Sequence, residues 1–156
     1  YLADRAPNAP VKTLDEIVRS RRFHPSVELR LRDASTATEP PEQSSGCASR
    51  EAVRAELRVA VEQLMDSLSL DALVYPTWSN PPRLIGDLNT PHGDNSQLFS
   101  PSTGFPAITV PMGYTRKNTL PAGITFFGRA WSEGRLISLS YDYEQSTRHR
   151  RAPMLR

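Results

Sequence analysis

The stretch SPSTGFPAITVPMG at 100–113 most constrains the fold, because it leads from a loop directly into a short apolar strand. Residues 107–110 are rich in β-branched side chains and lie between Pro106 and Pro111. Such a run, bounded by turn signals on both sides, is typical of a short buried strand. Proline has no backbone N–H, so we expect both prolines at the ends of this strand and not inside its hydrogen-bond ladder.

Two further apolar runs predict strands that join it in a sheet. Residues 72–75 follow a turn at Asp71 and stop at Pro76, whereas residues 124–127 follow a turn region at 113–123. The short connection from 107–110 to 124–127 favours a hairpin-like, antiparallel return over a crossover. With helices on either side, these strands predict a mixed β-sheet flanked by α-helices, which is an α/β fold that the chain does not complete on its own.

Three segments are expected to be helical. Thr13 is placed as the N-cap of a short helix that extends to about Arg21, with acidic residues in its first turn. Ser132 is placed as the N-cap of a C-terminal helix, where Trp131 is expected to pack on Leu136 as a hydrophobic staple. Residues 49–70 form the clearest helix, because apolar residues recur along it at helical spacing: Val53, Leu57, Ala60, Val61, Leu64 and Leu68.

Composition divides the chain into a helical segment at 1–32, a flexible linker at 33–47 and a main part at 48–156. The linker is mostly Ser, Thr, Ala, Glu and Pro, with almost nothing to bury. Only 38% of the 156 residues are hydrophobic, so we expect a small or incomplete core. The chain starts at Tyr1 without a methionine, from which we expect a trimmed product, a processed chain or a fragment. Half a sheet predicts marginal stability in isolation.

Charge and cysteine content narrow the function classes. The net charge of +2 is too small to indicate nucleic-acid binding. The single cysteine, Cys47, excludes an internal disulfide and a four-cysteine zinc site. No apolar run approaches the ~20 residues of a membrane span, and no signal-peptide pattern is visible. The compartment is not indicated.

The loop at 77–105 carries the candidate chemistry, because it lacks periodicity and is dense in hydrogen-bonding side chains. Its polar and aromatic residues are Trp78, Asn80, Arg83, Asp87, Asn89, His92, Asp94, Asn95 and Ser96. We favour a pocket wall, with a plain structural loop close behind. Two weaker alternatives are a serine-hydrolase triad of His92, Asp94 and Ser100 or Ser102, and a metal site of His92, Asp87 and Asp94.

Four blocks in fixed order resemble the C-terminal part of amidase-signature hydrolases. They are LDALVYPT at 70–77, TGFPAITVPMG at 103–113, LPAGI at 120–124 with FGRAWSE at 127–133, and YDYEQST at 141–147; NAPVKTL at 8–14 is also similar to the middle of such enzymes. The resemblance implies hydrolysis of a carboxamide by a Ser–cis-Ser–Lys triad, without metal or organic cofactor. The triad's Gly/Ser-rich signature is absent here, and the lysines are only Lys12 and Lys117. No catalytic residue can therefore be assigned.

What the resemblance does imply is a role in the substrate pocket and the sheet. Its candidate substrate-binding residues are Trp78, Asn80, Asp87, His92, Asn95 and Ser96. Its implied partners are a small-molecule amide and either an N-terminal amidase half or a second copy of the chain. The competing hypothesis is a non-enzymatic remnant or a protein-interaction module, in which a free sheet edge binds another protein.

Overall fold

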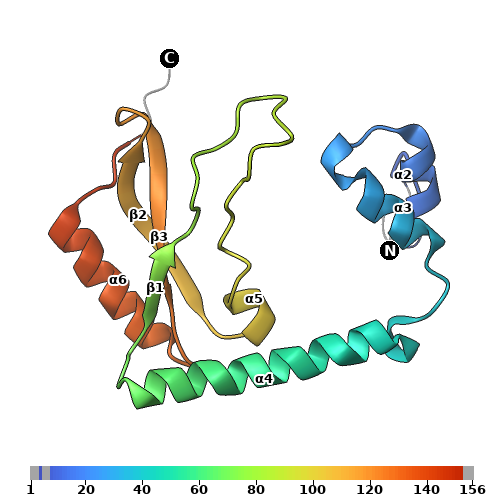
Figure 1. Ribbon diagram of the computed structural model, residues 1–156. Helices are drawn as coiled ribbons and strands as arrows, with labels where there is room; N and C mark the ends of the chain where they lie inside the picture. The colour runs from blue at the N-terminus through green and yellow to red at the C-terminus, as the bar shows by residue number, and fades with distance from the viewer. Residues whose placement is uncertain (1–3, 5–7, 153–156) are drawn as a thin grey trace. The chain divides into compact units, whose positions relative to one another are not determined.

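A computed structural model of the chain describes residues 4 and 8–152, apart from the side chain of Pro41 (Figure 1). The predicted segments at 1–32 and 48–156 each extend in part over residues outside this range. The chain divides into two compact units, Tyr1–Ala48 and Ser49–Arg156, and each is described by itself. Among the described residues no helix is both long and apolar enough to cross a membrane.

The first unit consists of short helices: α2 (Leu14–Ser20), a 3₁₀ turn at Pro25–Val27, α3 (Glu28–Thr36) and a second 3₁₀ turn at Pro41–Gln43. The N-cap predicted at Thr13 is confirmed, because its hydroxyl accepts the N–H of Glu16 at 3.2 Å. The Glu16 carboxylate accepts the N–H of Thr13 in return, at 3.4 Å. This reciprocal pair satisfies two N–H groups that the first helical turn leaves unpaired.

The predicted linker at 33–47 contains more regular structure than its composition indicated. The helix α3 continues to Thr36, and the long helix α4 (Ser45–Ser67) already begins before Ala48. Within α3 the Ser35 hydroxyl donates to the Arg32 carbonyl of the preceding turn at 2.8 Å, so its polar group has a partner inside the helix. The flexibility of the segment stays a prediction.

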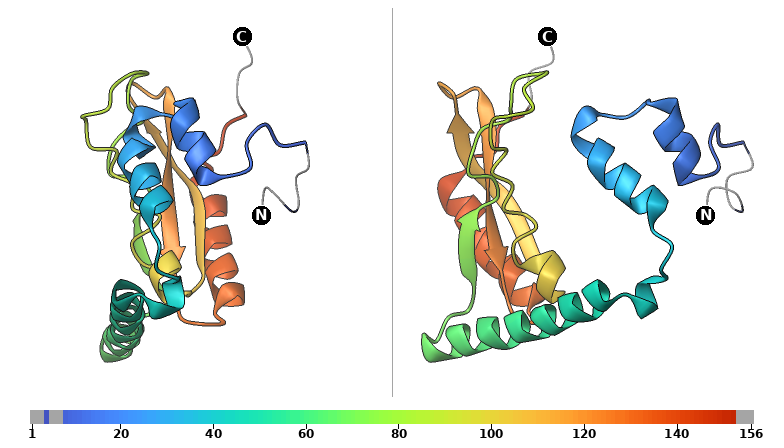
Figure 2. Two further views of the ribbon diagram at one scale, coloured as in Figure 1. Left: turned by 90° about the vertical axis from the view of Figure 1, so that its right-hand side faces the viewer. Right: turned by 45° about the vertical axis from the view of Figure 1, so that its right-hand side comes forward.

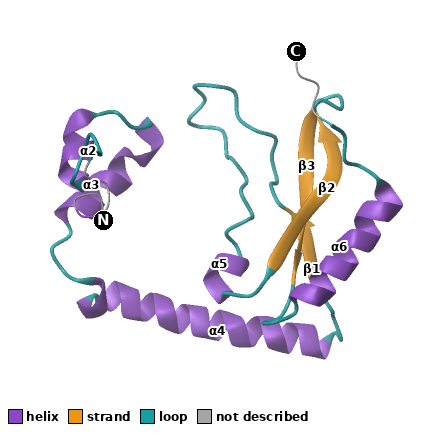
Figure 3. Cartoon of the chain, turned by 180° about the vertical axis from the view of Figure 1, so that it is seen from behind, coloured by secondary structure: helices purple, strands orange, loops and turns teal. Residues whose placement is uncertain are grey.

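The second unit is built on a three-stranded sheet of order β1-β3-β2 (Figures 1 and 3). Its strands are β1 (Leu73–Pro76), β2 (Ala107–Thr115) and β3 (Leu120–Phe127). Both pairings are antiparallel, so the predicted return of β3 along β2 is confirmed. The strands and the helices beside them confirm the α/β class, and within the described residues every strand pairing is antiparallel.

The strand β2 is longer than predicted, because Pro111 does not end it. The pairing register shifts between Pro111 and Gly113, which marks a β-bulge at the proline. A bulge on an outer strand accommodates a residue that has no N–H to donate. The connecting turn is correspondingly short, and Arg116, Lys117 and Asn118 in it have positive φ.

The two faces of β3 pack against different partners. Phe127 is fully buried in a cluster with Val61 and Met65 of α4 and with Phe105. On the opposite face, Phe126 contacts Tyr143 of α6 (Glu133–Thr147), with ring centroids 5.7 Å apart. The alternation of side chains along a strand explains why neighbouring residues enter different layers.

One packing prediction was wrong, and another holds only in part. Trp131 is 92% exposed and has a φ of 64°, so its backbone turns the indole away from the helix and no staple forms on Leu136. The predicted apolar stripe of α4 is buried only around Val61, whereas Val53 and Leu68 are more than half exposed. Within the described part of the chain, neighbouring side chains bury only part of that stripe.

The loop between β1 and β2 lies on the side of the sheet opposite α6, as both Figure 1 and Figure 2 show. It ends in the single turn α5 (Ser100–Thr103), which is closed by Gly104 at a φ of 75°. The Arg58 side chain of α4 donates from Nε to the Thr103 carbonyl at 2.7 Å. The end of the loop is thus fixed to the core.

Candidate functional site

Residues 77–79 and 93–95 of the long loop are held together by an irregular antiparallel pairing. The N–H of Ser79 donates to the Gly93 carbonyl at 2.7 Å, and the N–H of Asn95 donates to the Thr77 carbonyl at 2.9 Å. Trp78 forms an isolated bridge with Asp94 between these bonds. Backbone hydrogen bonds therefore fix the loop directly after β1, although its sequence shows no strand periodicity.

Close approach of the two segments requires glycine at position 93. Gly93 has a φ of 69°, and a Cβ there would lie 2.8 Å from Asn80 Nδ2 and 2.9 Å from the Asn80 backbone nitrogen. L-residues rarely adopt this φ. The Asn80 amide can therefore lie against the backbone and donate to the Pro91 carbonyl at 3.0 Å.

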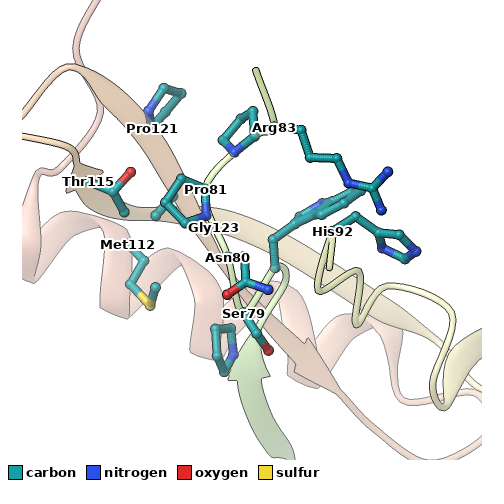
Figure 4. Close-up of a pocket in the computed structure, with 13 residues that line it drawn as sticks. Ser79, Asn80, Pro81, Arg83, His92, Met112, Thr115, Pro121 and Gly123 are labelled. Carbon is teal, nitrogen blue, oxygen red and sulfur yellow. The ribbon is translucent and has the colours of Figure 1, made fainter. Parts of the chain in front are cut away.

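A cavity of about 750 Å³ opens between this loop and the sheet (Figure 4). One wall comes from the loop, with Trp78, Asn80, Arg83 and His92 among its lining residues. The other wall comes from β2 and β3 and includes Met112, Thr115, Pro121 and Gly123. Apolar and aromatic walls with a few polar groups are typical of small-molecule sites.

Trp78 and His92 form the aromatic part of the loop wall. Their rings meet edge to face, with centroids 5.9 Å apart and an interplanar angle of 68°. His92 Nδ1 accepts the backbone N–H of Asp94 at 3.0 Å. In the neutral ring the proton is therefore on Nε2, which makes that atom a hydrogen-bond donor.

Arg83 is the cationic residue of the wall. It is half-buried, and its Nη1 donates to the Leu88 carbonyl at 3.3 Å. The Nε atom is buried without a hydrogen-bond partner. No carboxylate of the described residues forms an ion pair with this guanidinium.

Three of the six predicted site residues lie in the wall, and the other three serve the loop itself. Trp78, Asn80 and His92 line the cavity. Asn95 donates from Nδ2 to the Pro76 carbonyl and to Ser79 Oγ, both at 2.8 Å. Ser96 donates from Oγ to the Asp94 carboxylate at 2.6 Å.

Asp87 closes a turn at the far end of the loop. Its carboxylate accepts the N–H groups of Asn89 and Thr90, each at 3.0 Å. Hydrogen bonds from the Thr90 hydroxyl and from these two N–H groups lower the pKa of the Asp87 carboxyl to about 2. The substrate contacts expected of Asp87, Asn95 and Ser96 stay predictions, but their side chains already have partners within the loop.

Neither alternative site is assembled. Ser100 Oγ donates to the Phe105 carbonyl at 2.7 Å, and His92 Nδ1 is occupied by the Asp94 N–H, so these side chains are not arranged as a nucleophile and its base. Within the described part of the chain, no three His, Cys, Asp or Glu side chains gather as a metal-binding group. The predicted set of His92, Asp87 and Asp94 is therefore not brought together.

A row of threonines crosses the sheet next to the cavity. Thr125 is buried and shares hydrogen bonds with Thr77 at 2.8 Å and Thr109 at 3.0 Å. Thr77 and Thr109 also line a second, smaller cavity of about 400 Å³, which shares Trp78 and Gly123 with the first. The row holds the three strands together beside the site.

Sequence reasoning missed the sheet's contribution to the wall and did not select Arg83. Met112 and Thr115 enter the cavity wall because β2 continues past Pro111, and Gly123 does so because β3 begins at Leu120 and not at the predicted residue 124. Arg83 was visible in the polar loop. The only sequence signal for a wall that is both apolar and cationic is the position of Arg83 between Pro82 and the apolar pair Leu84 and Ile85.

Comparison with known proteins gives consistent matches. The family model described as Amidase matches residues 4–137. A glutamyl-tRNA(Gln) amidotransferase subunit of Thermodesulfovibrio yellowstonii is 36% identical over 92 residues, which are 55% of this chain and 19% of that protein. The corresponding subunit of Legionella pneumophila strain Corby is 30% identical over 96 residues, 58% of this chain and 20% of that protein.

Solved structures extend the match over most of the chain. The native peptide amidase of Stenotrophomonas maltophilia aligns with a TM-score of 0.70 and 30% identity, over 93% of this chain and 30% of that one. An amidase family protein of Bacillus anthracis strain Ames has the same fold, with a TM-score of 0.66 at 22% identity, over 95% of this chain and 27% of that one. The chain thus spans about a fifth of the curated relatives and under a third of the solved structures.

Proposed function

Because the chain belongs to the amidase family, we propose that it forms the substrate-pocket wall and part of the sheet of an amide hydrolase. The reaction is hydrolysis of a carboxamide to a carboxylate and an amine. In this proposal the chain binds and orients the substrate but is not catalytically competent alone. The nucleophile and its base come from the part of the fold that this chain does not span.

The observation that carries the proposal is the cavity between the loop and the sheet. It combines the indole of Trp78, the imidazole of His92 and the amide of Asn80 in one wall. The indole offers an apolar surface, and the two polar groups can hydrogen-bond an amide or its leaving amine. No chemistry at a serine is required of this wall, in agreement with the engaged hydroxyl of Ser100.

The sheet offers two outer strands to the rest of the fold. The order β1-β3-β2 leaves β1 and β2 with one neighbour each, and Val74 on β1 is 56% exposed. Unpaired edges and exposed apolar side chains are stabilised when further strands or helices cover them. We therefore propose that an N-terminal amidase part, on the same or another chain, pairs there. In the relatives named as amidotransferase subunits the matched residues are about a fifth of one longer chain, and the word subunit in their names agrees with a further partner.

The proposal is tested by reacting the chain with a fluorophosphonate that labels activated serines, read out by intact mass. The comparison is the same chain joined to the part of the Stenotrophomonas maltophilia peptide amidase that it does not cover. We expect labelling of the joined protein and none of the chain alone. Labelling of the chain alone would assign a nucleophile to it, whereas a folded joined protein without labelling or amide hydrolysis would favour a non-enzymatic module.

A substitution of His92 distinguishes a role in substrate binding from a role in bond cleavage. In the joined protein, His92→Ala is expected to raise KM and to leave substantial kcat, because His92 contacts the substrate without taking part in bond cleavage. Complete loss of kcat in a protein that keeps its thermal unfolding transition would show that His92 does chemistry, against the proposal.

A further inference from the structure

We propose that the cavity selects amides that carry a carboxylate, and that Arg83 is the residue that recognises this group. The inference rests on the proposed function, since it names the class of amide that the same pocket would take. It begins from the one cationic side chain among the lining residues. The other lining residues are apolar or neutral, and they include Trp78, Met112 and Pro121.

Arg83 has more hydrogen-bond donors than partners. A guanidinium has five N–H donors, and the residues that the structure describes supply one acceptor, the Leu88 carbonyl at 3.3 Å from Nη1. Nε is buried without a partner. Protein atoms cover Nε, so an incoming acceptor would bind the Nη side of the guanidinium, where the one printed bond, to Leu88, is long at 3.3 Å.

Within the described residues, no carboxylate forms an ion pair with the Arg83 guanidinium. Asp87 is the acidic residue whose charge interacts with Arg83, but its carboxylate is bound by the N–H groups of Asn89 and Thr90 at 3.0 Å and makes no ion pair with Arg83. Arg83 differs in this respect from Arg135, whose guanidinium forms an ion pair with Asp71 at 3.0 Å. Arg83 is thus available for an external anion.

The shape of the guanidinium and the rest of the wall define the ligand. The planar fork of arginine matches the two oxygens of a carboxylate and binds them in a bidentate manner. One arginine neutralises one negative charge, which favours a carboxylate over a doubly charged phosphate. The indole of Trp78 and the side chain of Met112 then favour an apolar group on the same amide.

The binding test uses a pair of probes that differ only in charge, N-benzylsuccinamate and N-benzylsuccinamide. Each has an apolar ring and an internal amide, and one ends in a carboxylate where the other ends in a carboxamide. The chain contains two tryptophans, so Trp131→Phe leaves Trp78 as the fluorescent reporter inside the wall. Titration at pH 7 gives a Kd for each probe.

We expect the carboxylate to bind about tenfold more tightly than the carboxamide, because charge-assisted hydrogen bonds are stronger than neutral ones. Arg83→Gln is expected to bring the ratio of the two Kd values to about one. Arg83→Lys keeps the charge but not the fork, so we expect a reduced preference of about threefold. The matched control Arg50→Gln removes an exposed arginine from α4, outside the lining, and should leave the ratio unchanged.

Each other outcome overturns a specific statement. Equal binding of the two probes by the parent chain refutes the carboxylate preference and leaves the pocket function intact. A preference that survives Arg83→Gln refutes the role of Arg83. If neither probe binds to the chain and the joined protein hydrolyses neither, both the inference and the proposed pocket fail. If the chain alone shows no cooperative unfolding transition, kcat/KM for release of benzylamine from each probe is compared in the joined protein and in its Arg83→Gln variant, and a ratio unchanged by the substitution refutes the role of Arg83.

Discussion

Substitution of Gly93 by alanine tests whether the loop pairing builds the cavity wall. Gly93 and Gly86 both lie in the long loop and both have positive φ, 69° and 87°. They differ in their surroundings. A Cβ at Gly93 would lie within 3 Å of two Asn80 atoms, one of them in the backbone, whereas a Cβ at Gly86 would have no atom within 4 Å. Gly86→Ala is therefore a matched control for the backbone cost alone.

The expected magnitudes follow from these two costs. An L-residue in the left-handed region costs about 1–2 kcal/mol, and alanine recovers about 0.4–1 kcal/mol by restricting the unfolded chain. Gly86→Ala should therefore lower the free energy of unfolding by about 1 kcal/mol. Gly93→Ala must in addition displace Asn80, which breaks its bond to the Pro91 carbonyl and strains the loop base. We expect a total loss of about 2–4 kcal/mol.

The assay is equilibrium urea unfolding of Trp131→Phe protein, monitored by the fluorescence of Trp78. This reporter lies beside the substituted position, because Trp78 pairs with Asp94. The loop can open before the core, so hydrogen exchange of the Ser79 and Asn95 amides is measured in parallel. A difference between the two variants of less than about 0.5 kcal/mol, with unchanged exchange at both amides, would refute the close packing of the loop segments.

Three further predictions concern the core, the threonine row and the acidic turn. Phe127→Ala should destabilise the second unit by about 3–5 kcal/mol, measured by thermal or urea unfolding, because the ring is fully buried between α4 and the loop; a loss below about 1 kcal/mol would contradict the packing. Thr125→Val keeps the shape but removes the hydroxyl that bridges Thr77 and Thr109, and urea unfolding should show a loss of about 1–3 kcal/mol, with Ser138→Ala on the exposed face of α6 as a neutral control. The folded-state pKa of Asp87, about 2, lies below its ordinary value of 3.8. The stabilisation by its carboxylate is therefore present above about pH 4 and is lost as the pH falls towards 2. NMR titration of the carboxyl should give this pKa, and Asp87→Asn should remove the corresponding pH dependence of the urea midpoint.

Local signals in the sequence predicted much of the fold. The N-cap at Thr13, the antiparallel return of β3 and the long helix α4 each depend on residues close in the chain. Such features are set by propensity, capping and turn length, which a sequence displays directly. The extension of β2 through Pro111 was missed, because a bulge depends on the partner strand and not on the proline alone.

The candidate site was only half predictable for a related reason. Trp78, Asn80 and His92 belong to a loop whose composition indicated a pocket wall. Asn95 and Ser96 carry the same kinds of side chain, but the loop uses them for its own hydrogen bonds. Which polar residues remain available to a ligand is decided by partners up to 19 positions away, as in the bond from Asn95 to Pro76. Composition alone does not show such pairings.

The prolines of the cavity wall have a consequence for how specificity can change. Pro76, Pro81, Pro82 and Pro121 all line the cavity, and none of them can donate a backbone hydrogen bond. Because proline restricts the backbone, such a wall loses little conformational entropy when a ligand binds. Polar recognition of the ligand then depends mostly on a few side chains. A single substitution among these side chains would then exchange one class of ligand for another without rebuilding the scaffold, so that divergence in substrate choice could proceed one residue at a time.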